Sequence, residues 1–341
     1  MIATINRDLP SSKLASMDNS EPLNSDEINE RIVGRSSQIS EITTSLRKVA
    51  ATDCTVLITG ETGTGKELAA KFIHQHSPRA HQPFVVINCA AIPDTLLESE
   101  LFGHERGAFT GAVTKQEGGI LAANHGTVFF DEIGDMSPYA QAKILRTIEN
   151  KEVRPVGGNR NIPIDVRFVA ATNQNLEELI KQGKFRADLY FRLNVARILL
   201  PPLRERKRDI FLLIDYFRQT FNQRYGKQVE GFTDEALAIL MDYDWPGNIR
   251  ELKNFMEMTS IFAHKKIAIA DFPESFRQRL LETMGHHDER SRLISALFET
   301  NWNKARAAQK LNWSRMTLYR KMAKYGVESA TQEEPQAAYF G

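Results

Sequence analysis

Short apolar runs alternate with longer amphipathic stretches from about Ile32 onward. The stretches between the runs have helical periodicity, as at Lys66–His76 and Pro138–Asn150, where Ser137 is a natural N-cap. Strands that alternate with helices predict an α/β fold, in which helices cover both faces of a parallel sheet. The short runs are rich in β-branched and aromatic residues, which favour strands, and they fall at Thr55–Thr59, Phe84–Asn88, Thr127–Asp131, Val166–Ala171 and Ala196–Leu200.

After Pro201-Pro202 the strand signal stops, and helical periodicity predicts an all-helical subdomain with helices at about Asp209–Arg224, Asp234–Asp242 and Ile249–Ala263. A polar stretch around Met284 then leads to a helix-turn-helix pattern at Trp302–Met322. The first 31 residues are polar and lack periodicity, which predicts a disordered arm. The predicted organisation is an arm (1–31), an α/β subdomain (32–203), a helical subdomain (204–270), a linker (271–290), a small helical domain (291–327) and a flexible tail (328–341).

The charge distribution changes this picture. The whole chain carries 44 Lys and Arg against 43 Asp and Glu, a formal net charge of +1. Residues 291–327 hold eight basic residues and one acidic residue, or +7, so the remainder of the chain carries −6. A basic module on an acidic body predicts a nucleic-acid partner. On charge alone, the alternative is a solvated helix face that is rich in Lys and Arg.

Composition excludes several classes of protein. With 42% apolar and 26% charged residues, the chain has the composition of a globular protein. Its two cysteines, Cys54 and Cys89, are too few for a disulfide scaffold or a cysteine-rich zinc module. We find no apolar stretch of about 18 residues and no signal peptide, so we expect a cytoplasmic protein without a membrane partner.

A glycine-rich loop follows the first predicted strand directly and opens a helix. Its sequence fits the GxxxxGK pattern, in which backbone N–H groups hold phosphates and the lysine reaches the β and γ oxygens. Glu67 stands where a Ser or Thr usually ligates Mg²⁺, so the metal needs another carboxylate. The candidate ATP-binding residues of the loop are Gly60, Glu61, Thr62, Gly63, Thr64, Gly65, Lys66 and Glu67.

That carboxylate is available at the end of another strand, where Asp131 and Glu132 follow an apolar run. We expect Asp131 to hold Mg²⁺ and Glu132 to polarise the attacking water. Asn88, Thr172 and Asn173 also lie at strand ends and could hydrogen-bond a γ-phosphate or a carboxylate. Each of these three is equally compatible with a helix or turn cap. Together with the loop, the acidic pair predicts a nucleotide hydrolase.

At this point the sequence resembles the AAA+ ATPases, and within them the transcription activators that act on sigma-54 RNA polymerase. The resemblance rests on the hexapeptide GAFTGA between the second and third strands, and on a phosphate loop of the family's form. It covers about residues 32–327 and implies an AAA+ subdomain, a helical lid at 204–270, ATP with Mg²⁺ as cofactors, and a loop that contacts sigma-54. The hexapeptide consists of Gly107, Ala108, Phe109, Thr110, Gly111 and Ala112.

The resemblance also implies roles for individual residues. Asn88 matches the residue that restrains the catalytic glutamate, and Thr172 and Asn173 match the first sensor. Arg186 and Arg192 match arginine fingers that reach a neighbouring subunit, although a salt bridge to Asp188 or Glu178 remains open for one of them. Arg250 matches the second sensor, in the lid. These roles imply a ring of subunits, a hexamer in the family.

The basic module is similar to the Fis-type helix-turn-helix domains that close this activator family. Ala307, Ala308 and Leu311 are expected to face Leu318 and Met322 across the turn. The candidate DNA-binding residues are Lys304, Arg306, Ser314, Arg315, Thr317, Tyr319, Arg320 and Lys321.

These features predict an enhancer-binding activator that uses ATP hydrolysis to remodel sigma-54 polymerase and open the promoter. The alternatives are an AAA+ motor with another partner, such as a chelatase or helicase, and a DNA-binding repressor. Because relatives often carry a large N-terminal receiver or sensor domain, which this sequence lacks, we expect control by a partner in trans, a co-activator or expression level.

Overall fold

The computed structural model describes residues 32–91, 94–109, 111–262, 265–283, 289–300, 302–325 and 327. The predicted arm (1–31) and tail (328–341) lie outside the described residues. The chain divides into two compact units, residues 1–206 and 207–341. Among the described residues, no helix has the length and apolar character needed to cross a membrane.

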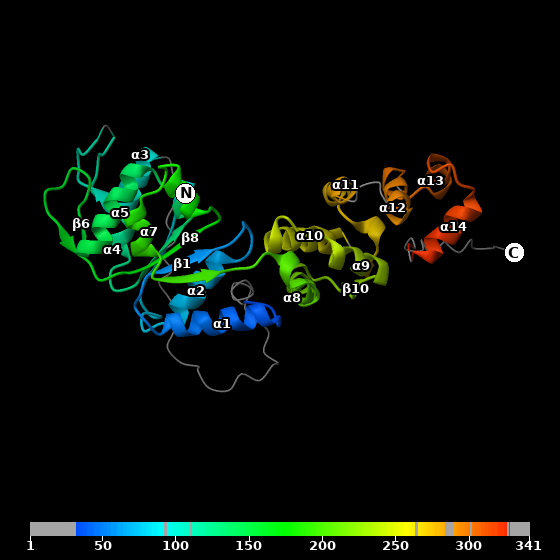
Figure 1. Cartoon of the computed structure of the whole chain (residues 1–341), viewed down its shortest axis with the longest axis horizontal. Coiled ribbons are helices and arrows are strands. Elements are labelled where there is room, and N and C mark those ends of the chain that lie inside the picture. Colours follow the sequence, from blue (N-terminus) through cyan, green and yellow to red (C-terminus); the bar gives the residue numbers. More distant parts are fainter. Residues whose placement is uncertain are drawn as a thin grey trace. The chain divides into compact units, whose positions relative to one another are not determined.

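A five-stranded sheet with parallel neighbours forms the centre of the first unit (Figure 1). Its strand order is β2-β5-β8-β1-β9, with β2 at Phe84–Asn88, β5 at Thr127–Asp131, β8 at Arg167–Thr172, β1 at Val56–Thr59 and β9 at Ala196–Leu199. The predicted parallel α/β fold is confirmed, and each strand lies within one residue of its predicted bounds at either end.

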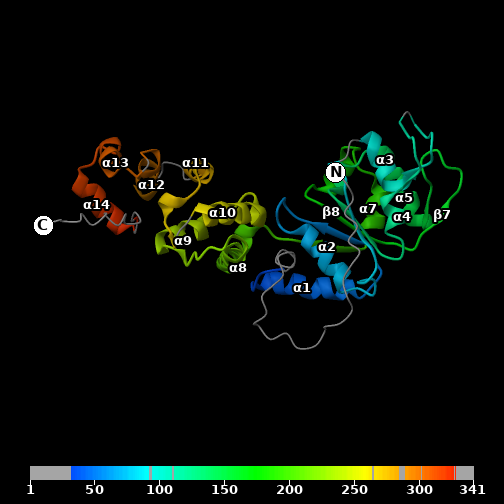
Figure 2. The same cartoon turned by 180° about the vertical axis from the view of Figure 1, so that it is seen from behind.

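Helices cover both faces of this sheet, because successive residues of a strand point to opposite sides. Phe129 and Val169 pack with α1 (Ser37–Ala50) and α2 (Lys66–Gln75). Phe130 and Phe168 belong to the other core. The helices of that second face are α3 (Asp94–Phe102), α4 (Gly119–Ala122), α5 (Pro138–Asn150), α6 (Leu176–Lys181) and α7 (Ala187–Leu193). In Figures 1 and 2, α3, α4, α5 and α7 lie on the side of the sheet opposite α1 and α2.

Two small hairpins extend from this unit. Strands β3 (Gly103–His104) and β4 (Gln116–Glu117) pair antiparallel and enclose the GAFTGA hexapeptide. Strands β6 (Glu152–Val153) and β7 (Ile162–Pro163) pair in the same way and enclose residues 154–161, which we term the β6–β7 loop. Short 3₁₀ turns lie at η2 (Ile133–Asp135) and η3 (Leu203–Arg206).

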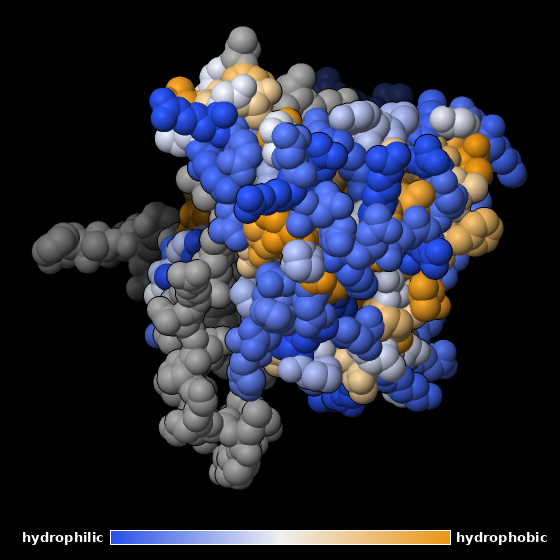
Figure 3. Space-filling model, turned by 90° about the vertical axis from the view of Figure 1, so that its left-hand side faces the viewer, coloured by the Kyte–Doolittle hydropathy of each residue, from blue (hydrophilic) through white to orange (hydrophobic). Residues whose placement is uncertain are grey.

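The face of the first unit seen in Figure 3 is dominated by hydrophilic residues, with apolar residues scattered between them. Isolated exposed apolar residues, such as Tyr139 and Val113, are normal on protein surfaces. The polar surface and the two apolar cores together account for the amphipathic pattern of the helices.

The second unit is mainly helical. Trp245, Phe255 and Phe276 are buried against one another, with ring centroids 4.5–5.8 Å apart. The side chain of Thr233 caps α9 by accepting a hydrogen bond from the N–H of Ala236. The elements are α8 (Lys207–Tyr225), β10 (Gly231–Phe232), α9 (Asp234–Asp242), α10 (Asn248–Phe262), β11 (Lys266–Ile267), η4 (Ile269–Asp271), α11 (Glu274–Thr283), α12 (Glu289–Glu299), α13 (Lys304–Lys310) and α14 (Arg315–Lys324).

Two features of this unit differ from the sequence-based prediction. A short parallel pair, β10 with β11, interrupts the subdomain that was expected to be all-helical. The stretch 271–290, expected to be a linker, contains α11, because Phe276 and Leu280 lie one helical turn apart and are both buried. The break around Met284 lies outside the described residues.

Candidate functional site

The glycine-rich loop joins β1 to α2 at the carboxyl end of the sheet. Gly65 has a φ of 103°, a left-handed conformation that side chains disfavour. At Gly60 a Cβ atom would lie 2.8 Å from the carbonyl oxygen of Leu200. The loop therefore requires glycine at Gly65 for its turn and at Gly60 for its close approach to the chain that follows β9.

Lys66 and Glu132 contact each other beside this loop. The Lys66 side chain is 6% exposed; its Nζ atom lies 3.2 Å from Oε1 of Glu132 and donates to the carbonyl oxygen of Gly60 at 3.1 Å. The other carboxylate oxygen of Glu132 accepts a hydrogen bond from the backbone N–H of Asn173 at 2.9 Å. The Asn173 side chain donates to Thr62 at 2.9 Å. The loop, the acidic pair and one predicted sensor residue thus form one hydrogen-bonded network.

Asp131 lies on the same network through its Oδ1 atom, which accepts from the N–H of Glu132. Burial, and next the charge of Glu132, raise the pKa of Asp131 above its usual value. Thr172 is fully buried; its backbone oxygen accepts from Gly60, and its hydroxyl accepts from Gln174. The end of β8 is thereby bonded directly to the start of the phosphate loop.

Asn88 lies opposite Asp131 in the register of the sheet. Its side-chain oxygen accepts hydrogen bonds from the N–H groups of Ala90 and Ala91, both at 3.0 Å. Asn88 therefore caps the turn after β2, which was its alternative interpretation from the sequence. Restraint of Glu132 by Asn88 stays a prediction, since in this structure Glu132 contacts Lys66 and Asn173.

Two arginines next to the loop were not among the residues predicted from the sequence. Arg204 forms two hydrogen bonds with the carboxylate of Glu61, at 2.8 and 2.5 Å, and Arg206 donates to the carbonyl oxygen of Thr64 at 3.2 Å. Their only sequence signal is a run of cations shortly after β9. Glu67 forms an ion pair with Lys71 on α2.

The two predicted arginine fingers lie at the ends of α7. Arg186 forms a bidentate pair with Asp188, which raises the pKa of the guanidinium through these hydrogen bonds. Arg192 bonds to Glu149 at 3.0 Å, rather than to Glu178. Both side chains remain substantially exposed, at 47% and 60%. They are accessible to a partner despite these contacts.

In the GAFTGA loop, Gly107–Ala112, the N–H of Gly107 donates to the carbonyl oxygen of Ala112, and the N–H of Ala112 donates to that of Phe109. Phe109 is 40% exposed, and its ring lies against His104 with centroids 5.0 Å apart. The buried His104 bonds in turn to Ser99 at 2.6 Å. Thr110 lies outside the described residues.

The β6–β7 loop supports the base of the GAFTGA hairpin. Val156 bonds to Gly103 and Glu105 at 2.8 and 3.0 Å through its backbone. At Gly157 a Cβ atom would lie 2.8 Å from the Cβ of Ala108. The two loops are thus in direct contact.

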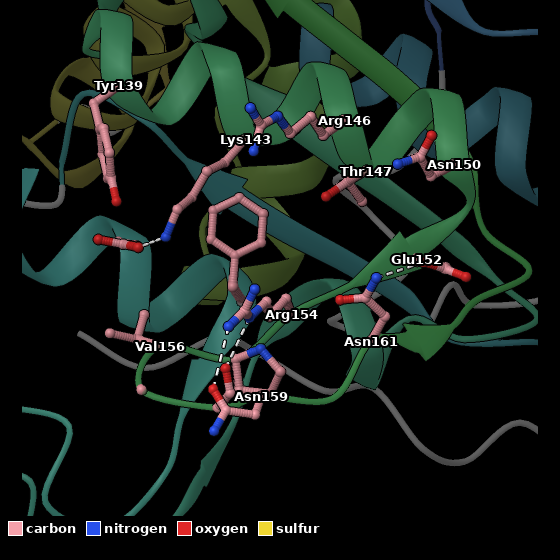
Figure 4. Close-up of a pocket in the computed structure, with 15 residues that line it drawn as sticks. Tyr139, Lys143, Arg146, Thr147, Asn150, Glu152, Arg154, Val156, Asn159 and Asn161 are labelled. Atoms are coloured by element: carbon pink, nitrogen blue, oxygen red, sulfur yellow. Dashed lines mark hydrogen bonds and ion pairs between the residues drawn. The ribbon is translucent and has the colours of Figure 1, made fainter.

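A cavity of ≈ 570 Å³ lies between this loop and helices α3 and α5 (Figure 4). In it Lys143 pairs with Glu98 and lies over the ring of Tyr139, and burial lowers the pKa of Lys143. Figure 4 shows Arg154 turned toward Asn159 and Asn161 toward Glu152, contacts of 3.3 and 2.9 Å. These contacts hold the β6–β7 loop in the shape that meets the GAFTGA hairpin.

In the second unit, α13 and α14 form a helix-turn-helix. Ser314 caps α14, and Asn312 in the turn has a φ of 54°. Ala307, Ala308, Leu318 and Met322 are buried as expected, whereas Leu311 is only partly buried. Arg306, Arg315, Tyr319 and Arg320 are exposed, and Ser314 and Thr317 are bonded to each other at the start of α14.

Among the candidate DNA-binding cations, Lys321 and Lys304 have intramolecular partners. Lys321 bonds to Glu289 at 2.6 Å and is 19% exposed, and Tyr325 bonds to the same carboxylate. Lys304 lies over the ring of Tyr319 at 5.3 Å. Met316, which was not predicted as a contact, is 78% exposed in the first turn of α14. Arg250 is exposed on α10, and its role as second sensor stays a prediction.

Three family models match most of the described chain. The Sigma-54 interaction domain family matches residues 32–199, the AAA+ ATPase lid domain matches 204–288, and the Fis family of bacterial regulatory proteins matches 288–325. The first two matches meet close to the boundary between the two compact units.

Two relatives and one solved structure illustrate the likeness. The transcriptional regulatory protein ZraR of Salmonella typhimurium is 44% identical over 301 residues, covering 86% of this chain and 68% of ZraR. The Nif-specific regulatory protein of Azotobacter vinelandii is 44% identical, covering 85% of this chain and 58% of that protein. The structure of NtrX from Brucella abortus in complex with ATP has a TM-score of 0.70 at 30% identity, covering 89% of this chain and 71% of NtrX. The chain therefore belongs to the family of sigma-54-dependent transcriptional activators, with a sigma-54 interaction domain, an AAA+ lid and a Fis-type DNA-binding domain in that order.

Proposed function

We propose that this chain binds ATP with Mg²⁺, hydrolyses it in a ring of subunits, and uses the GAFTGA loop to remodel sigma-54 polymerase at a promoter. The observation that supports this most strongly is the contact of Lys66 with Glu132 beside the glycine-rich loop. A cation for phosphate and a carboxylate for water are both needed at one place in an ATPase.

In the proposed site, the N–H groups at the start of α2 and the ammonium of Lys66 bind the phosphates. Binding moves Lys66 from Glu132 to the phosphate oxygens, and Glu132 is then able to orient water. Asn173 keeps the carboxylate in position through its backbone N–H. Thr172 holds the end of β8 against the loop and contributes to the site by position.

The acidic pair also fits a divalent cation. Burial and the charge of the neighbouring Glu132 raise the pKa of Asp131, because both disfavour its ionised form. A hard cation such as Mg²⁺ prefers carboxylate oxygen ligands and would relieve this repulsion. Asp131 is the residue that would hold Mg²⁺, which when bound neutralises phosphate charge.

Arg186 and Arg192 are proposed to act on the nucleotide of a neighbouring subunit. Their guanidinium groups are exposed, and each is held by a carboxylate of its own chain. A guanidinium supplied in trans stabilises the charge of the transition state and makes hydrolysis depend on assembly. The proposed partner is a second copy of this chain, in a ring that is hexameric in the family.

Contact with sigma-54 is proposed for the GAFTGA loop, where Phe109 provides an exposed apolar side chain. The Fis-type module is proposed to bind an upstream DNA site through the exposed face of α14. On this proposal, one chain carries out hydrolysis, polymerase contact and DNA binding.

The test is open-complex formation by the purified chain with sigma-54 polymerase and promoter DNA. We expect open complexes with ATP and none with a non-hydrolysable analogue. Open complexes with the analogue at the level seen with ATP would contradict the coupling. Thr110→Ala is expected to lose sigma-54 binding and keep basal hydrolysis; the reverse pattern would refute the docking role of this loop.

A further inference from the structure

Two arginines in the segment that leads into the lid sequence donate hydrogen bonds to the phosphate loop. Arg204 holds the Glu61 carboxylate by two charge-assisted hydrogen bonds. Arg206, only 4% exposed, donates to the carbonyl oxygen of Thr64. Glu61 and Thr64 flank Thr62 and Gly63 within the phosphate loop, so the two arginines contact the loop on both sides of this pair.

These two arginines lie at the end of the first unit, directly before the first helix of the second. Residues 203–206 form η3, and Lys207 is the first residue of α8, where the second unit begins. The lid family match starts at residue 204. The contacts of Arg204 and Arg206 therefore join the phosphate loop to the residues that immediately precede α8.

Charge makes these contacts responsive to nucleotide. Glu61 places a carboxylate in a loop that is to receive phosphates, and Arg204 neutralises it with a bidentate geometry that fixes direction as well as distance. Phosphates bound by the loop compete with Glu61 for nearby positive charge. Any shift of the loop backbone at Thr64 would change its hydrogen bond with the planar guanidinium of Arg206.

We propose that Arg204 and Arg206 are positioning residues that transmit phosphate-loop occupancy to α8, the first helix of the lid. They act through Glu61 and Thr64 rather than on the nucleotide. The inference rests on the proposed binding of nucleotide by this loop.

Hydrogen exchange of α8 amides, measured with and without ADP, tests the proposal in the full chain. In the wild type, ADP is expected to change the protection of residues 207–225. In Arg204→Ala this change is expected to fall at least threefold, while a fluorescent ADP analogue binds within threefold of the wild-type Kd. A full response of α8 in Arg204→Ala would overturn the proposal.

The charge-swapped pair Glu61→Arg with Arg204→Glu is expected to recover the α8 response that either single change loses. Failure of recovery, with ADP still bound, contradicts transmission through this pair. The matched control is Arg197→Ala. Arg197 lies on β9 and forms a comparable exposed ion pair with Glu177 on α6, and its loss is expected to leave the α8 response to ADP intact. If ADP does not bind the wild-type chain, the proposed function is wrong. If ADP binds but the exchange of α8 amides does not change, only the proposed role of Arg204 and Arg206 is wrong.

Discussion

The Nζ atom of Lys66 lies 3.2 Å from Oε1 of Glu132. A cation and a carboxylate with separate proposed tasks in hydrolysis are therefore partners of each other in this structure. On the proposed function, phosphate competes with Glu132 for the ammonium group, and we expect nucleotide binding to release the carboxylate.

Glu132→Gln is expected to keep nucleotide binding and to lower hydrolysis by about 100-fold or more, the range for loss of a general base. The amide keeps the shape of the side chain but neither attracts Lys66 strongly nor polarises water. The measurements are titration with a fluorescent ATP analogue and phosphate release. Glu178→Gln, an exposed carboxylate on α6, is the control. Turnover at the wild-type rate in Glu132→Gln would refute the assignment.

Gly157→Ala is expected to weaken sigma-54 binding while ATP binding is retained. The added Cβ would lie 2.8 Å from Ala108 and would displace the GAFTGA loop. Gly183→Ala is the control. Gly183 has a similar φ of 70° but open space around it, so its substitution introduces the backbone strain without the steric contact. Both changes incur roughly 1 kcal/mol of left-handed strain. Equal sigma-54 binding by the two variants would count against the contact.

Mixing two inactive variants tests the arginine fingers. Arg192→Ala subunits have an intact phosphate loop, and Lys66→Ala subunits have intact fingers. If fingers act in trans, mixed assemblies combine one intact site with one intact finger and regain ATPase activity. Loss of a finger lowers hydrolysis by on the order of 10³-fold in other nucleotide hydrolases. Absence of any recovery at all mixing ratios, with co-assembly verified by pull-down, argues against action in trans.

Two adjacent cations on α14 are expected to differ in DNA binding. Arg320 is exposed, whereas Lys321 bonds to Glu289 within the module. Arg320→Ala should reduce the slope of log affinity against log salt by about one for non-specific duplex DNA. Lys321→Ala should leave this slope near the wild-type value and lower the melting temperature of the module. Fluorescence anisotropy at several salt concentrations measures the slopes, and identical losses in both variants would contradict the distinction.

His74 predicts a loss of stability in mild acid. Burial lowers its pKa from 6.5 to about 4, and the ring bonds to Thr127 at 3.0 Å. Because the unfolded chain binds the proton more readily, stability falls as pH drops from 6.5 toward 4, by about 2 kcal/mol between pH 7 and pH 5. His74→Gln keeps a hydrogen-bonding group and should flatten this dependence in urea unfolding. An unchanged pH dependence in the variant would exclude His74 as its source.

Local patterns predicted the elements of this protein well because each strand and helix carries its own signal. The strand at Thr127–Asp131 was predicted with its observed bounds, and Ser137 caps the helix expected of it. The helix α11 was missed because its buried positions, Phe276 and Leu280, stand in an otherwise polar stretch. The pair β10–β11 was missed because two residues per strand leave no periodicity to detect.

The sequence by itself determined the sheet, the phosphate loop, the acidic pair and the order of the domains, since these depend on spacing along the chain. Only the tertiary structure showed that Lys66 meets Glu132, that Gly157 meets Ala108, and that Lys321 turns inward to Glu289. It also brought Arg204 to Glu61 across 143 positions of sequence. Such partners are set by how strands and loops pack at the carboxyl edge of the sheet and between helices, and residues far apart in the chain carry no local signal of that contact.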